Sequence, residues 1–173
     1  MLAEITLIQQ SRLFLGHPTY AITVVLGTLL VAGGVGSGIA GRLQSSSVTP
    51  IPLPWWPPVG VVAALALWLI LWPQISVQFR SLELTGRVAL VAVAALPAGI
   101  FIGMPFPVGL RAVGYWGERQ VALGWAVNGV TSVAGSILAV AFAMWMGYQA
   151  VLLLAITFYA LVAVVAITLP IRS

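Results

Sequence analysis

The chain has 173 residues, of which 61% are hydrophobic and only 6% are charged. With a mean hydropathy of +1.12, it has too little polar surface to coat a water-soluble globule, which indicates an integral membrane protein. The absence of cysteine excludes disulfide bonds and thiolate metal sites. The net charge of +4 comes from scattered arginines that form no basic patch, which argues against a nucleic-acid partner.

These features predict an all-α fold, a polytopic membrane helix bundle of about five transmembrane helices with an N-terminal interfacial or partial helix. Residues 1–173 are expected to form a single transmembrane domain. Its apolar runs are long enough to span the bilayer, because about 20 helical residues cross a hydrocarbon core of about 30 Å. The spans are predicted at about 20–40, 57–72, 88–103, 120–146 and 150–169. The chain is expected to be a multi-pass protein of the bacterial inner membrane. Its expected partners are the lipid bilayer and other membrane protein subunits.

Residues 1–16 form the first predicted element. They lack the basic segment and the small-residue cleavage site of a signal peptide, so they are kept as part of the folded chain. Wound as a helix, they spread apolar and polar residues, among them Glu4 and Arg12, around most of the circumference. Two interpretations stay open, an interfacial helix or the end of a membrane helix that begins upstream of Met1.

The first complete span contains glycines that imitate a dinucleotide-binding fingerprint. Gly36, Gly38 and Gly41 have G-x-G-x-x-G spacing, but they lie inside a membrane-length apolar run, and the chain has no Asp to bind a ribose. Packing is therefore the favoured interpretation. Gly34 and Gly38, with Ser37, are predicted to form a small-x-x-x-small surface for close helix contact.

Prolines and glycines mark the predicted breaks between the middle spans. Residues 42–58 are expected to form a loop that is rich in proline, and Pro73 is expected to end the second span. Pro97 is expected to kink the third span. Prolines and glycines in residues 104–119 are expected to prevent any regular helix there.

The span at 120–146 has the strongest pattern in the chain. Small and polar residues recur at steps of three or four and form a seam on one side of the helix: Asn128, Ser132, Gly135, Ala139 and Ala143, with Ser136 beside it. An Asn side chain in hydrocarbon needs partners, and small residues let another backbone approach closely enough to supply them. We predict that this helix is the packing spine of the bundle, with Asn128 as its polar centre. A tight turn at residues 147–149 is expected to fold it into a hairpin with the last span.

Few residues in the chain can carry chemistry. There are three glutamates, one histidine and no aspartate, so no catalytic residues, cofactor or metal site are predicted. Glu4, His17 and Arg111 are the candidates for a ligand or partner contact. His17 is interpreted as a hydrogen-bonded residue at a helix start, with haem ligation as the alternative. Arg111 is interpreted as a boundary arginine that snorkels to water.

Four segments of the chain together resemble a known family. These are EITLIQQSRLFLGHP at residues 4–18, the glycine-rich helix ending in GSG, MPFPVGLR at 104–111 and GWAVNGVTSVAGSILAV at 124–140. The chain resembles the membrane region of spermidine synthase-like integral membrane proteins, in which membrane spans are fused to a soluble aminopropyltransferase-like or methyltransferase-like domain. That domain would use aspartates, which this chain lacks, so the resemblance implies the membrane scaffold alone.

Three functional hypotheses follow from the sequence. The first is a non-catalytic membrane module that acts as a scaffold, anchor or accessory subunit of a larger membrane complex. The second is a transporter or channel for a small organic solute, for example a polyamine-like one, which the kinked third span, the irregular residues 104–119 and Asn128 would favour and the lack of an evident internal repeat would disfavour. The third is a membrane enzyme, which would need Glu4, His17 or Glu118 to act in catalysis.

Overall fold

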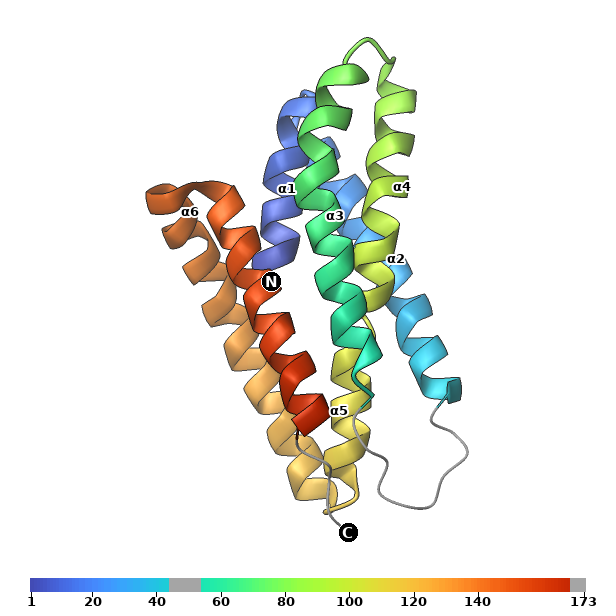
Figure 1. Cartoon of the computed structure of the whole chain (residues 1–173), viewed down its shortest axis with the longest axis vertical. Helices are drawn as coiled ribbons and strands as arrows, with labels where there is room; N and C mark the ends of the chain where they lie inside the picture. Colours follow the sequence, from blue (N-terminus) through green and yellow to red (C-terminus); the bar gives the residue numbers. More distant parts are fainter. Residues whose placement is uncertain (44–53, 169–173) are drawn as a thin grey trace.

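The computed structural model describes residues 1–43 and 54–168, and these residues form helices joined by short turns (Figure 1). The helices are α1 (Leu2–Leu15), α2 (Pro18–Leu43), α3 (Trp56–Gln78), α4 (Leu84–Ile102), α5 (Pro105–Gly114) and α6 (Glu118–Thr168). The predicted all-α bundle is confirmed. Most of the loop predicted over residues 42–58 lies outside the described residues, but α3 already begins at Trp56, because Pro57 and Pro58 fall in its first turn, where no N–H is needed.

Within residues 1–43 and 54–168, four helical stretches are long and apolar enough to cross a membrane: Pro18–Arg42, Trp56–Gln78, Leu84–Gly114 and Glu118–Thr168. Large apolar side chains point away from the rest of the chain along them. Met144 is 80% exposed and Trp145 is 90% exposed. Side chains of this kind are stable in contact with lipid rather than water. The described residues thus have the surface of a multi-pass membrane bundle.

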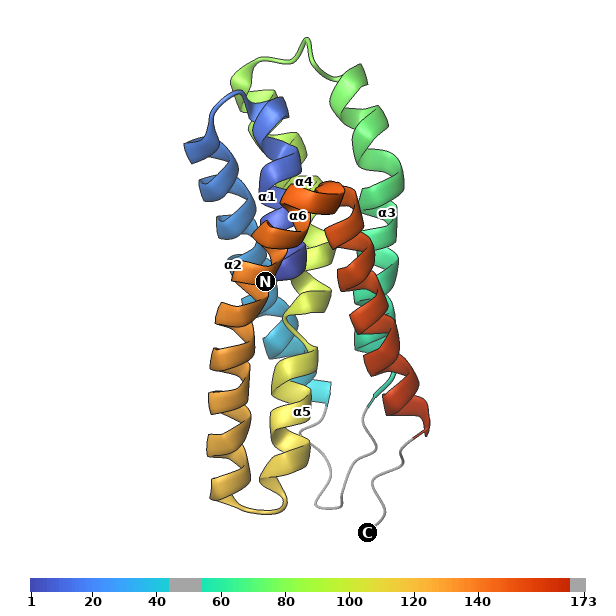
Figure 2. The same cartoon turned by 90° about the vertical axis from the view of Figure 1, so that its left-hand side faces the viewer.

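Helix α6 is a hairpin of two arms. Gly147 breaks the helical conformation with φ 80° and ψ 162°, a region that glycine reaches without a steric penalty. Figures 1 and 2 show the chain reversing there, so that the two arms run antiparallel. The turn predicted at this position is confirmed.

Prolines interrupt the helices less than the sequence predicts. Helix α3 continues through Pro73 to Gln78. A proline inside a membrane helix is tolerated where neighbouring helices and local adjustments satisfy the freed backbone group. Residues 105–114 form the regular helix α5, which corrects the prediction of an irregular segment. Pro105 and Pro107 lie in its first turn, where their missing N–H groups would have no partner in the helix.

Helix α1 packs against α2, α4 and α6, and Trp68 and Trp72 of α3 donate hydrogen bonds to Gln10 of α1. Thr6, Leu7 and Ser11 are completely buried, so one face of α1 is packed against the other helices of the bundle. Two polar side chains of α1, those of Thr6 and Gln10, find partners there, while the buried hydroxyl of Ser11 has none among the described residues. The Thr6 hydroxyl donates to the carbonyl of Leu2 at 2.9 Å, and the indole of Trp68 donates to Oε1 of Gln10 at 2.8 Å.

The most extensive packing among the described helices is between α2 and α4. It depends on glycines that allow the two backbones to meet: a Cβ at Gly36 would overlap the carbonyl of Ile100, and one at Gly103 would overlap the backbone of Gly33. The predicted contact through Gly34 and Gly38 is not formed among the described helices. Both are exposed with open space around them, because α4 covers the neighbouring face of α2.

Candidate functional site at the α6 hairpin

The N-terminal half of α1 lies between the two arms of α6. Ala139 and Ala143 of the first arm and Val151 of the second arm form a buried cluster against Leu2 and Ile5 of α1. Figure 2 shows the N-terminus of the chain beside this hairpin, about midway along the bundle. The hairpin therefore holds the end of α1 through small side chains that allow close approach.

The predicted seam on the first arm of α6 faces the bundle. Ala139 and Ala143 are buried, and the remaining seam residues are half-buried: Asn128, Ser132, Gly135 and Ser136. The opposite face is exposed, as at Val130, Val133 and Ile137. A Cβ at Gly135 would lie 3.7 Å from the Cβ of Met1, so α1 covers the upper part of the seam. The Ser136 hydroxyl donates to the carbonyl of Ser132 at 2.9 Å and is satisfied within its own helix.

Asn128 lies along the arm between two contacts with other helices. Below it, α5 packs on the arm: a Cβ at Gly124 would lie 3.0 Å from Cδ1 of Leu110, and the rings of Phe106 and Trp125 meet edge to face at 4.9 Å. Above it, α1 covers the seam. The side-chain amide of Asn128 makes no hydrogen bond to any other described residue. It is a half-buried polar group that residues 1–43 and 54–168 leave without a partner.

A second polar feature is a pocket of about 220 Å³ beneath the first turn of α1. It is lined by Met1, Leu2, Ala3, Glu4, Ile102, Ala155, Phe158 and Tyr159. Glu4 is the only acidic residue of this lining. Its side chain is 20% exposed, and its Oε2 lies 3.4 Å from the amine of Met1. The pocket thus combines one carboxylate and one phenol with apolar and aromatic walls.

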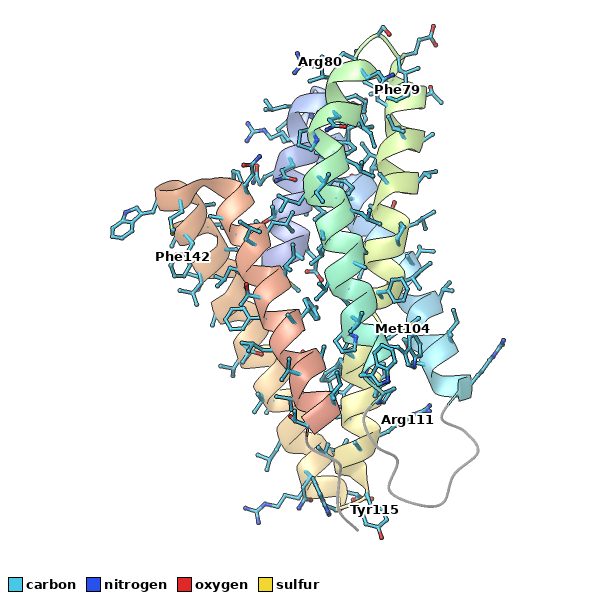
Figure 3. All side chains as sticks on the ribbon, in the orientation of Figure 1. Phe79, Arg80, Met104, Arg111, Tyr115 and Phe142 are labelled. Carbon is cyan, nitrogen blue, oxygen red and sulfur yellow. The ribbon has the colours of Figure 1, made fainter. Side chains whose placement is uncertain are left out.

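Arg111 and His17 both make hydrogen bonds at helix ends. The guanidinium of Arg111 donates to the carbonyl of Gly41 at 2.8 Å, which satisfies an end group of α2 (Figure 3). Nδ1 of His17 accepts from the backbone N–H of Thr19 at 3.3 Å, at the start of α2. These contacts give both residues a structural role in the described part of the chain.

The three residues that an enzyme hypothesis would need do not converge. The turn between α1 and α2, which contains His17, and the start of α6, which contains Glu118, lie towards opposite ends of the bundle (Figure 1). Glu4 belongs to the first turn of α1. Within residues 1–43 and 54–168, no group of three His, Asp or Glu side chains is positioned to hold a metal ion.

Sequence reasoning missed a hydrogen-bonding centre at the upper end of the bundle. The guanidinium of Arg87 donates to the carbonyls of Leu82 at 2.8 Å and Phe14 at 3.2 Å, and also to that of Arg80. One arginine therefore ties the α3–α4 turn to the end of α1. The residue types do not reveal this centre, because all three acceptors are backbone carbonyls. One of them, the carbonyl of Phe14, is also 73 positions away in the sequence.

Any functional assignment rests on these contacts, on the unpaired amide of Asn128 and on the pocket at Glu4. No family model, curated protein or solved structure matches the chain.

Proposed function

We propose that the chain is a non-catalytic integral membrane module that crosses the bilayer five times and holds a partner membrane helix. In this arrangement the two arms of α6 are separate crossings, and the module acts as a scaffold, anchor or accessory subunit of a larger complex. The resemblance of the sequence to the membrane region of spermidine synthase-like proteins supports this class, because membrane spans there accompany a separate catalytic domain.

The amide of Asn128 carries the proposal. An amide has two donors and two acceptor lone pairs, and leaving them unpaired in hydrocarbon costs about 2 kcal/mol or more. The single proton of the nearby Thr131 hydroxyl points to the carbonyls of Val127 at 2.7 Å and Asn128 at 3.2 Å, so this hydroxyl does not donate to the amide oxygen. Gly129 is exposed, with no atom within 4 Å of a Cβ placed there. A helix of another chain can therefore come close enough to bond the amide.

The first test replaces Asn128 by leucine. A photoreactive amino acid placed at Gly129 should form one discrete crosslinked product in native membranes, with a second copy or with another chain. Asn128→Leu should weaken that association by about 1 kcal/mol, roughly fivefold, as expected for one interhelical hydrogen bond in a membrane. The measurement is the fraction of the chain crosslinked, at matched expression.

Val130→Leu is the matched control, because Val130 is two residues away, is 71% exposed and carries no polar group. It should leave the crosslinked fraction unchanged. A crosslinked fraction that is the same for Asn128→Leu and Val130→Leu would contradict the role of the amide, and no discrete product at all would contradict the scaffold.

The pocket at Glu4 favours a second candidate, a carrier of a small cationic solute. A carboxylate attracts an ammonium group, and the rings of Phe158 and Tyr159 provide faces that cations prefer. If this candidate is correct, Glu4→Gln should reduce putrescine uptake into proteoliposomes by about tenfold or more. Glu118→Gln, which removes a charge outside the pocket, should leave uptake intact. Uptake no greater than in protein-free liposomes would eliminate this candidate.

A further inference from the structure

A larger pocket, of about 260 Å³, lies where the ends of α1 and α3 meet the turn of the α6 hairpin. It is lined by Gln10, Leu13, Phe14, Trp72, Pro73, Ser76, Arg80, Tyr148 and Gln149. Arg80 follows the last turn of α3 and lies at the upper end of the bundle in Figure 3. The pocket is therefore close to the level at which a membrane helix leaves the hydrocarbon.

The lining of this pocket can donate hydrogen bonds and carries positive charge. Arg80 contributes a guanidinium, and Gln149 and Gln10 contribute amides. The Oε1 atom of Gln10 already accepts from Trp68, so its amide nitrogen is the end that can turn to a ligand. No Asp or Glu lines the pocket, and no carboxylate lies within 4.0 Å of Arg80 in the described part of the chain. These groups suit an oxyanion.

The walls are held in place by contacts that do not use these donors. Arg87 bonds the backbone carbonyls of Arg80 and Phe14, which lie on two different elements of the lining. The indole of Trp72 stacks on Trp68 at 4.5 Å and meets Phe14 edge to face at 5.5 Å. A site whose walls are fixed before the ligand arrives loses less entropy on binding.

The pocket also borders the surface that lipid would cover. Leu13, one of its lining residues, is 91% exposed. The hairpin turn beside the pocket presents Trp145, which is 90% exposed and of the type that anchors helices at headgroup level. An oxyanion bound here can therefore be attached to acyl chains that lie against the helices.

We propose that this pocket binds a phosphate oxyanion, with Arg80 and Gln149 as its principal donors, and that the anion is the headgroup phosphate of an anionic phospholipid. The proposal is independent of the scaffold function, because it uses neither Asn128 nor Glu4.

The test is a lipid titration of the full chain in detergent, followed by native mass spectrometry. Phosphatidylglycerol should bind as one preferred copy, and diacylglycerol with the same acyl chains should not, because it has no phosphate. Arg80→Gln should raise the apparent dissociation constant about tenfold, the effect expected for a lost charged hydrogen bond. Arg80→Lys, which keeps the charge but not the fork, should bind with intermediate affinity.

Arg12→Gln is the matched control, since it removes the same charge at the same end of the bundle from a residue that does not line the pocket. It should leave the preferred copy bound. Arg80→Gln should keep the thermal unfolding midpoint of the parent chain, because Arg87 bonds the backbone carbonyl of Arg80 and not its side chain.

Inorganic phosphate separates the two sources of the anion. Failure of millimolar phosphate to displace the lipid would support the phospholipid, and displacement would support the same oxyanion site with free phosphate as a ligand. Equal weakening by Arg80→Gln and Arg12→Gln, or equal binding of diacylglycerol and phosphatidylglycerol, would overturn the proposal.

Discussion

Gly36→Ala should lower the free energy of unfolding by about 3 kcal/mol, the upper range for overpacking a well-packed contact. A Cβ at Gly36 would overlap the carbonyl group of Ile100, and that group belongs to the backbone of α4. A backbone cannot turn aside as a side chain can, so α2 and α4 would have to separate along their contact. The gain of about 1 kcal/mol in helix propensity from glycine to alanine does not offset this. Thermal unfolding of the purified chain in mild detergent measures the difference.

Gly34→Ala and Gly38→Ala are the matched controls. Both glycines lie on the same helix, two residues to either side of Gly36, and neither has an atom within 4 Å of the added Cβ. These variants should unfold at or slightly above the temperature of the parent chain. If Gly36→Ala unfolds at the same temperature as the two controls, the close crossing of α2 and α4 is wrong.

Arg87→Met should be the second most damaging change, with an expected loss of about 2 to 3 kcal/mol of stability. It removes the bonds from one guanidinium to the carbonyls of Leu82, Phe14 and Arg80. It also removes the contact of the guanidinium with the ring of Phe14, 5.8 Å from the ring centroid. Arg87→Lys should recover only part of the loss, because an ammonium lacks the planar fork that reaches several acceptors at once.

The local consequence of Arg87→Met is measurable by hydrogen exchange. The N–H of Leu82 bonds the carbonyl of Phe79 in the α3–α4 turn, and this amide should exchange faster once the turn is released from α1. Arg12→Met removes an exposed charge nearby and should change stability by about 0.5 kcal/mol or less. Equal effects of the two substitutions would show that Arg87 acts through its charge alone and not through these bonds.

The sequence by itself determined the class of the protein and its local breaks. Apolar runs of membrane length predict membrane helices, because every backbone group in hydrocarbon must be bonded within its own segment. The reversal at Gly147 follows from residue type, since glycine reaches positive φ without strain. The seam on the first arm of α6 is also readable, because its small and polar residues contrast with the large apolar side chains of the other face.

The tertiary structure alone decided which helix faces meet. Lipid and protein interior are equally apolar, so hydrophobic periodicity cannot distinguish the face of α2 that packs on α4 from the one that faces lipid. Gly36 and Gly38 look alike in the sequence, and only the position of Ile100 on α4 separates their roles. The burial of α1 and the bond from Arg87 to the carbonyl of Phe14 are likewise non-local. They depend on helices that are distant in the chain and become neighbours only when the bundle forms, because their hydrogen-bond partners come from other elements.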